Sequence, residues 1–292
     1  MSARLLFQIV FFVVLVGAAL AAGALLAYPV HLLLPMVEFS SVAERSSLLC
    51  GLVASLLYVR WTMPFSLAAI GYRRPATGLL PALAQSYGLG MLVMAVPVLL
   101  LSLLGLSHLD PDASFTPAFF LQALLIGLVA GFGASIIEET LFRGALYSGL
   151  ERRTNLFWTI LLSSLLYSAV HFLEYPSPDG DITWLTGLAL FPEAVGQMFR
   201  PGILSHFLTL FLLGVLLCLL RWRDGHVWRA FGLHAGIVMV IKLHSEIADK
   251  TTGTDYDFLV NVYSSRLGWL TTVWLLVILA VYGWHCYRKP AN

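Results

Sequence analysis

Five ionisable residues fall inside long apolar segments of the sequence. Glu138, Glu139 and Arg143 lie in GFGASIIEETLFRGALYSGLERR, His171 lies in LLYSAVHFLEY, and His234 lies in WRAFGLHAGIVMVIKLH. A charged side chain at the centre of a bilayer costs about 2.5–3.5 kcal/mol on insertion scales, so each of these residues needs a partner or a function. A glutamate beside two histidines from other helices would form an acid–base site or a metal site.

The spacing of these residues predicts which of them can meet. Residues four apart share a helix face, so Glu139 and Arg143 should pair, whereas Glu138 points elsewhere and has no local partner. Counted from the cytoplasmic ends of their helices, Glu138 and His171 both lie roughly 20 Å deep and can meet. His234 lies only about 10 Å deep, so it joins them only if its helix is tilted, broken or begins deeper.

Long apolar helices must position these residues. The 292-residue chain is 59% hydrophobic and 11% charged, with a mean hydropathy of +0.85, whereas soluble domains carry roughly 25% charged residues. A water-soluble fold is therefore excluded. Helices are expected near residues 5–27, 46–70, 78–105, 117–150, 155–173, 202–220, 227–245 and 267–287. We predict an all-α, polytopic membrane bundle of about eight transmembrane helices, forming a single transmembrane domain over the whole chain.

The loops between these helices predict an orientation. If the eight segments alternate across the bilayer, most of the 17 Lys and Arg residues fall on one side and most of the 16 Asp and Glu residues on the other. Because cytoplasmic loops carry an excess of basic residues, both termini are expected in the cytoplasm. The first apolar run exceeds the roughly 7–15 residues of a signal-peptide core and should be a retained span. The predicted helix at 46–70 is the weakest span, because it contains Arg60 and Pro64. It could instead be a short span that ends near Tyr58 and is followed by an interfacial segment.

Charge and cysteine content exclude other classes of partner and site. The net charge is only +1 and no basic face is concentrated, so no nucleic-acid partner is expected. Cys50, Cys218 and Cys286 lie in or beside separate apolar stretches without CxxC spacing, which argues against a disulfide framework or a zinc ribbon. The polar segments 174–184 and 244–257 are acidic and are expected to be solvated loops.

The ionisable motifs resemble those of the CPBP family of intramembrane peptidases, which includes the type II CAAX prenyl endopeptidases and bacteriocin-processing relatives. The family pattern is EExxxR, then FxxxH, then HxxxN or HxxxD, on three helical regions. Glu138, Glu139 and Arg143 complete the first motif, a fairly specific signal inside an apolar helix. The resemblance divides the chain into N-terminal helices (1–114), a core similar to the family (115–245), and a loop with the last span (246–292).

The second and third motifs are matched with one departure each. His171 matches the second motif, with Tyr167 in place of the phenylalanine. His234 matches the third, but Val238 stands where the family usually has Asn or Asp. Because valine cannot donate a hydrogen bond, any oxyanion contact from that position is absent or comes from another residue.

The resemblance implies peptide-bond hydrolysis at a cavity within the membrane, with Glu138 as the general base that activates water. The two histidines would orient the water and polarise the scissile carbonyl, or would hold zinc or another divalent metal together with Glu138; a metal-free mechanism is the alternative. The expected partners are membrane lipid and a membrane-associated protein or peptide substrate, and the expected location is a cell membrane, the bacterial inner membrane. The implied catalytic residues are Glu138, Glu139, His171 and His234, with Arg143 and Tyr167 in supporting positions.

Other interpretations use the same residues. Intramembrane Glu and His residues also form the relays of proton-coupled transporters, although we find no paired broken helices in related halves. A catalytically silent membrane scaffold is the third hypothesis, and Val238 is consistent with it. Among the remaining histidines, His206 is the strongest candidate for an additional site residue, although Ser205 and Thr209 beside it suggest ordinary interhelical hydrogen bonds.

Overall fold

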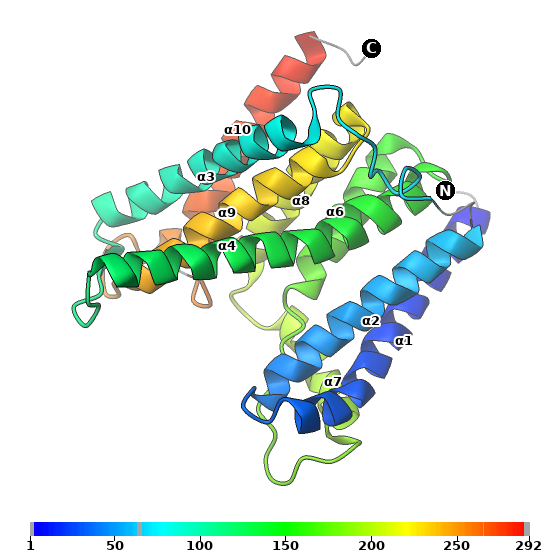
Figure 1. Cartoon of the computed structure of the whole chain (residues 1–292), viewed down its shortest axis with the longest axis horizontal. Helices are drawn as coiled ribbons and strands as arrows, with labels where there is room; N and C mark the ends of the chain where they lie inside the picture. The colour runs from blue at the N-terminus through cyan, green and yellow to red at the C-terminus, as the bar shows by residue number, and fades with distance from the viewer. Residues whose placement is uncertain (1–2, 63–65, 265, 289–292) are drawn as a thin grey trace.

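The computed structural model describes residues 3–62, 66–264 and 266–288, which are mostly helical (Figure 1). In chain order the elements are α1 (Ala3–Leu33), α2 (Phe39–Thr62), α3 (Leu79–Leu103), β1 (Ser107–Leu109), α4 (Pro117–Glu139), the π-helix η1 (Thr140–Leu146), α5 (Tyr147–Glu151), α6 (Leu156–Val170), α7 (Thr186–Gly196), the 3-10 helix η2 (Gln197–Phe199), α8 (Leu204–Asp224), α9 (Trp228–Ile247), β2 (Ala248–Lys250), the 3-10 helix η3 (Asp257–Leu259) and α10 (Trp269–Arg288). The two short strands pair antiparallel, with Ser107 opposite Lys250.

Six of the described helical segments are long and apolar enough to cross a membrane. They lie in α1, α3, the continuous run from α4 to α5, α8, α9 and α10. The fifth predicted segment corresponds to α6, which has only 15 residues, and the second corresponds to α2, which is not among the six. The helical membrane bundle is thus confirmed, whereas the count of eight spans and the cytoplasmic placement of both termini stay predictions.

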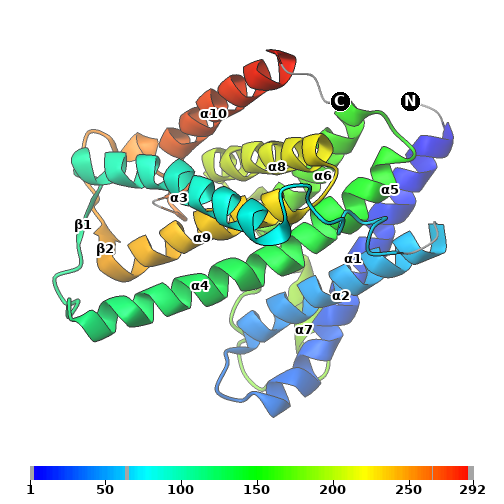
Figure 2. The ribbon, with the colours of Figure 1, turned by 45° about the horizontal axis from the view of Figure 1, so that its top comes forward.

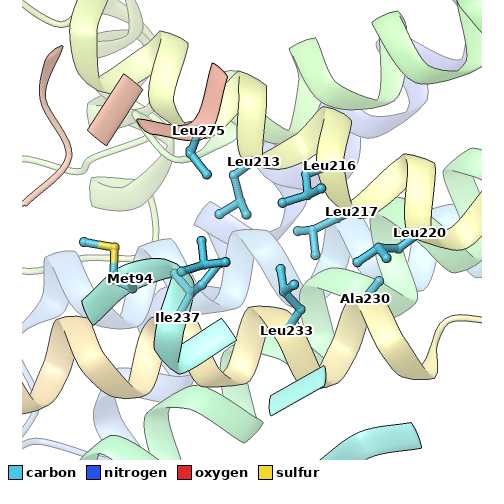
Figure 3. Close-up of a cluster of buried hydrophobic side chains, with 10 residues drawn as sticks. Met94, Leu213, Leu216, Leu217, Leu220, Ala230, Leu233, Ile237 and Leu275 are labelled. Atoms are coloured by element: carbon cyan, nitrogen blue, oxygen red, sulfur yellow. The ribbon is translucent and has the colours of Figure 1, made fainter. Parts of the chain in front are cut away.

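Helices α8 and α9 form the centre of the larger group of helices. Figure 2 shows α3, α9 and α4 side by side, and α9 packs against α3, α4 and α8. The apolar core lies between α3, α8, α9 and α10 and contains Met94, Leu217, Leu233 and Leu275 (Figure 3). Because lipid is as apolar as these side chains, close packing rather than the hydrophobic effect holds such helices together.

Glycines allow the helices beside α9 to approach it closely. A Cβ added at Gly90 of α3 would overlap the carbonyl oxygen of Leu233. A Cβ added at Gly131 of α4 would lie 2.7 Å from the carbonyl oxygen of Ala235. Small residues at such contacts are typical of helices packed within membranes. The position of α9 is therefore fixed from two sides immediately around His234.

The hairpin of α1 and α2 forms a second group with α7, as Figure 1 shows. The segment 174–184 is the loop that the sequence predicts, but α7 was not predicted. Its 11 residues are too few to span a bilayer, and they contain Gly187 and Pro192, which weaken a helical pattern. Gly187 lies directly against the carbonyl oxygen of Ala24 in α1.

Several predicted boundaries were wrong. The second helix begins at Phe39 rather than near residue 46, because polar residues of its first turns lower the hydropathy without preventing a helix; part of its predicted end, residues 63–65, lies outside the described chain. The segment 244–257 is not only a loop, since α9 continues to Ile247 and β2 follows. The long fourth helix is present, but it widens into a π-helix at Thr140–Leu146, which hydrophobic periodicity does not reveal.

Candidate active site

Three predicted site residues from three separate helical regions meet in the structure. Glu138 is the penultimate residue of α4, His171 directly follows α6, and His234 lies in α9. The Nε2 atom of His171 is 3.4 Å from Oε2 of Glu138, and the Nε2 atom of His234 is 3.8 Å from the same oxygen. The sequence-based expectation that these side chains could converge agrees with this geometry.

The start of α9 is held against the segment that precedes α3. The N–H of Val227, just before α9, donates to the carbonyl oxygen of Gly71 at 2.9 Å. The neighbouring carbonyl of Ile70 lies against Gly144, where an added Cβ would be 3.2 Å away. These contacts connect the start of α9, through residues 70 and 71, to the π-helix that follows Glu138.

Glu138 and its neighbour Glu139 occupy different surroundings. The side chain of Glu138 is 21% exposed, and its Oε2 atom is buried without a hydrogen-bond partner among the described residues. The side chain of Glu139 is 1% exposed, and its Oε1 atom forms an ion pair with Nη1 of Arg143 at 3.0 Å. This contact confirms the predicted pairing. Adjacent helical residues point about 100° apart, so two identical side chains can face different sides of α4.

Glu139 also contacts His234, which the sequence did not predict. Its Oε1 atom is 2.9 Å from Nδ1 of His234. Arg143 is fully buried, and its Nη2 donates to the carbonyl oxygen of Gly214 in α8 at 3.3 Å. A buried charge needs such partners because desolvation costs several kcal/mol. Glu139, Arg143 and His234 therefore form one buried network that fixes the orientation of the His234 ring.

Both imidazoles are held through Nδ1 and turn Nε2 toward Glu138. The Nδ1 atom of His171 lies 2.7 Å from the carbonyl oxygen of Tyr167, which can only accept a hydrogen bond. The Nδ1 of His234 faces the Glu139 carboxylate. We assign the proton of each ring to Nδ1 from these partners. Each Nε2 is then left for a water molecule, a substrate oxygen or a metal ion.

Tyr167 packs against most of the site. Its ring lies 4.2 Å from the guanidinium carbon of Arg143 and meets the His171 ring edge-on at 4.6 Å between centroids. The side chain is buried, and its ring also meets the His234 ring edge-on at 6.2 Å between centroids. Tyr167, which the family resemblance implied as a supporting residue, thus packs against Arg143, His171 and His234.

A buried serine next to the site was missed at the level of the sequence. Ser135 lies one helical turn before Glu138 on α4, it is fully buried, and its hydroxyl has no hydrogen-bond partner within the described chain. Its spacing of three residues from Glu138 was the available signal. His206 lies edge-on against Phe172, the residue that follows His171.

The side chains at the site are of the types that bind divalent metals, but they are not arranged around a common metal position. Two imidazoles and a carboxylate are a known zinc ligand set, and Nδ1 atoms bonded to a carbonyl or carboxylate are typical of histidine ligands. Within residues 3–62, 66–264 and 266–288, however, no three His, Cys, Asp or Glu side chains are arranged to hold one metal ion. The residues in this arrangement do not form a metal site.

Comparison with known proteins gives one match, and it covers the site. Residues 120–240 match the family model described as "Type II CAAX prenyl endopeptidase Rce1-like". No match to the chain is found among curated proteins or among solved structures. The matched segment runs from α4 to α9 and contains Glu138, Glu139, Arg143, His171 and His234, the residues on which the resemblance to CPBP peptidases was based. Residues 120–240 of this multi-pass membrane protein are therefore similar to the type II CAAX prenyl endopeptidase (Rce1-like) family, in agreement with the resemblance to CPBP peptidases.

Proposed function

We propose that the protein is an intramembrane endopeptidase that hydrolyses a peptide bond of a membrane-associated protein or peptide, with water activated by Glu138. The family match supports a protease of this class. The observation that carries the proposed mechanism is the placement of one Glu138 oxygen within 3.4 and 3.8 Å of two imidazole Nε2 atoms. These distances are longer than good hydrogen bonds, so the three groups can share a water molecule as a common partner.

In the proposed reaction the Glu138 carboxylate removes a proton from water as the oxygen attacks the scissile carbonyl carbon. A tetrahedral intermediate forms, with negative charge on the former carbonyl oxygen. The C–N bond then breaks, and Glu138 returns its proton to the departing amine nitrogen. One water molecule is consumed, and a carboxylic acid and an amine are produced.

The two histidines are assigned different tasks by their Nδ1 partners. We propose that during the reaction His234 carries a second proton, on Nε2, because the buried Glu139 carboxylate at Nδ1 offsets the charge of the ring. We therefore assign polarisation of the carbonyl oxygen to His234. The Nδ1 of His171 faces only a backbone carbonyl, so its Nε2 is better suited to accept a hydrogen bond from the attacking water.

A hydroxyl group replaces the hydrogen-bond donor that Val238 lacks. The hydroxyl of Tyr167, whose ring packs against both His171 and His234, is our first candidate to donate to the oxyanion. The second candidate is the Ser135 hydroxyl on the preceding turn of α4, which has no hydrogen-bond partner in the part of the chain that the structure describes. Either group would supply the stabilisation that a family asparagine at residue 238 would otherwise provide.

An apolar cavity beside the site supports a membrane-embedded substrate. The cavity has a volume of about 380 Å³ and is lined only by apolar side chains, which include Leu146, Leu166, Ala169 and Phe207. Leu166 and Ala169 belong to α6, the helix that ends at His171. This cavity could receive an apolar group of the substrate, and we expect a peptide ending in a prenylated CAAX sequence to be cleaved.

A zinc-dependent reaction remains a separate proposal. A zinc ion held by Glu138, His171 and His234 would polarise the carbonyl oxygen and acidify water. The present arrangement of these side chains does not form that site, so no step above depends on a metal. The inner membrane of a bacterium is our expected location.

The test is cleavage by purified protein in liposomes, with a synthetic prenylated CAAX peptide and its unprenylated counterpart as substrates. We expect Glu138→Gln to lose cleavage and the matched variant Glu193→Gln, at an exposed position of α7, to keep it. Mass spectrometry of the released C-terminal peptide identifies the bond. Undiminished cleavage by Glu138→Gln would exclude the glutamate mechanism, and proton-coupled flux without cleavage would favour a transporter instead.

A further inference from the structure

A second cavity lies away from the candidate active site, where the loop before α3 meets the connection between α8 and α9. Its volume is about 450 Å³. The charged and titratable side chains that line it are those of Arg73, Arg74, Arg223, Asp224, His226 and Arg229. The positive-inside rule assigns this end of the bundle to the cytoplasm. The cavity contains none of the residues proposed for catalysis.

The charges around this cavity are unbalanced. Four arginines face one carboxylate among the described lining residues, and that carboxylate, Asp224, pairs with Arg229 at 3.4 Å. Burial lowers the pKa of His226, so this side chain is neutral at pH 7 and does not change the balance. The cavity therefore carries an excess of positive charge that an anion would offset.

One buried guanidinium donor and one buried imidazole nitrogen in the cavity wall lack partners among the described residues. The Nη1 atom of Arg223 and the Nδ1 atom of His226 are buried without hydrogen-bond partners within the described part of the chain. His226 as a whole is only 8% exposed. An unpaired buried polar group costs about 1–3 kcal/mol, more when it is charged. A ligand that accepts hydrogen bonds here would remove that cost.

The walls of the cavity are fixed before any ligand binds. The Trp228 indole Nε1 donates to the carbonyl oxygen of Arg73 at 3.0 Å, and the Val227 N–H donates to the carbonyl oxygen of Gly71. The ring of Tyr72 meets the ring of Trp228 edge-on at 5.0 Å between centroids. A preformed site loses less conformational entropy on binding, which favours a specific ligand over loose ion association.

We propose that this cavity binds the phosphate of an anionic phospholipid headgroup. The planar guanidinium group forms paired hydrogen bonds with phosphate oxygens, so a cluster of arginines suits a phosphate ligand. A cation is a poor ligand here, because the lining includes only one carboxylate among the described residues. The cavity lies at the ends of α8 and α9, which are candidate spans, and exposed Trp222 beside it is typical of the headgroup level. Basic pockets between membrane helices on the cytoplasmic side bind anionic headgroups in this way.

The test compares lipid retention by two double variants that lose the same charge. Arg73→Gln/Arg223→Gln removes two cavity arginines, whereas Arg45→Gln/Arg152→Gln removes two exposed arginines elsewhere. The full-length protein is titrated in detergent with phosphatidylglycerol and with phosphatidylcholine, and bound lipid is counted by native mass spectrometry. At about 1 kcal/mol for each arginine, the cavity variant should bind phosphatidylglycerol roughly 10- to 30-fold more weakly.

The control variant should bind phosphatidylglycerol like the unmodified protein, and phosphatidylcholine binding should not change in either variant. Equal loss in both double variants, or no loss in the cavity variant, would overturn the proposal. A short-chain phosphatidylglycerol should also raise the melting temperature of the unmodified protein, which keeps the test informative if a variant fails to fold. If inorganic phosphate alone gives the same rise, the ligand is a free phosphate and the lipid assignment is wrong.

Discussion

Replacing each of the two adjacent glutamates by glutamine should separate catalysis from stability. Glu138→Gln removes the proposed base but keeps the shape of the side chain. Glu139→Gln removes one charge from the buried pair with Arg143 and weakens the hold on His234. Both variants should lose cleavage, for different reasons, whereas only Glu139→Gln should lose much stability.

The expected magnitudes follow from the contacts. Removing one partner of a buried ion pair costs about 3–5 kcal/mol, because the other charge is left uncompensated. Arg143, with 0% exposure, is such a charge. For a chain of this size the loss corresponds to a fall in Tm of roughly 6–10 °C. The Oε2 atom of Glu138 has no hydrogen-bond partner among the described residues, so Glu138→Gln should change the free energy of unfolding by about 1 kcal/mol or less. The rate of cleavage should fall by about 10²- to 10⁴-fold.

Thermal unfolding in detergent and cleavage of the prenylated peptide in liposomes are the two measurements. Glu193→Gln, on the exposed side of α7, controls for the chemical change itself. If Glu138→Gln and Glu139→Gln lower Tm by the same amount, the division of tasks between the two glutamates is wrong. If Glu139→Gln keeps full activity, the His234 ring does not depend on the Glu139 carboxylate.

Three further predictions concern the hydroxyl donor, the helix packing and the metal. Tyr167→Phe should keep the ring packing and Tm but lower the cleavage rate, and an unchanged rate would leave Ser135 as the donor to test. Gly90→Ala should lower the free energy of unfolding by about 1–3 kcal/mol through overlap with the α9 backbone, whereas Gly88→Ala on the same helix, with open space around it, should not. Purified, active protein should contain no stoichiometric zinc by elemental analysis, and loss of activity on chelation that zinc restores would show a metal mechanism instead.

The pairing within the fourth predicted helix could be read from the sequence, because it depends only on helical spacing. Glu139 and Arg143 are four residues apart and pair as expected, even though the π-helix begins between them. The membrane character of the bundle also follows from composition and from runs of apolar residues. Local periodicity and length are sufficient for these features.

The meeting of the three helical regions could not be derived from local patterns. Counting residues from the helix ends places His234 about 10 Å shallower than Glu138, yet its Nε2 atom lies 3.8 Å from Oε2 of Glu138. The bond between Glu139 and His234 likewise depends on how closely α4 and α9 approach, which Gly131 permits. Such contacts join residues about 95 positions apart in the chain, and no spacing rule covers them.

The buried network explains why two neighbouring, identical side chains need not share one task. A buried ion pair is a weak source of stability, because desolvation of both charges offsets their attraction. The pair of Glu139 and Arg143 does, however, leave one carboxylate oxygen in contact with Nδ1 of His234, and this contact turns Nε2 of that ring toward Glu138. Glu138 then meets two oriented imidazoles and takes no part in the buried pair of Glu139 and Arg143. Burial of Glu139 is thus unfavourable by itself, but it orients the His234 ring toward Glu138.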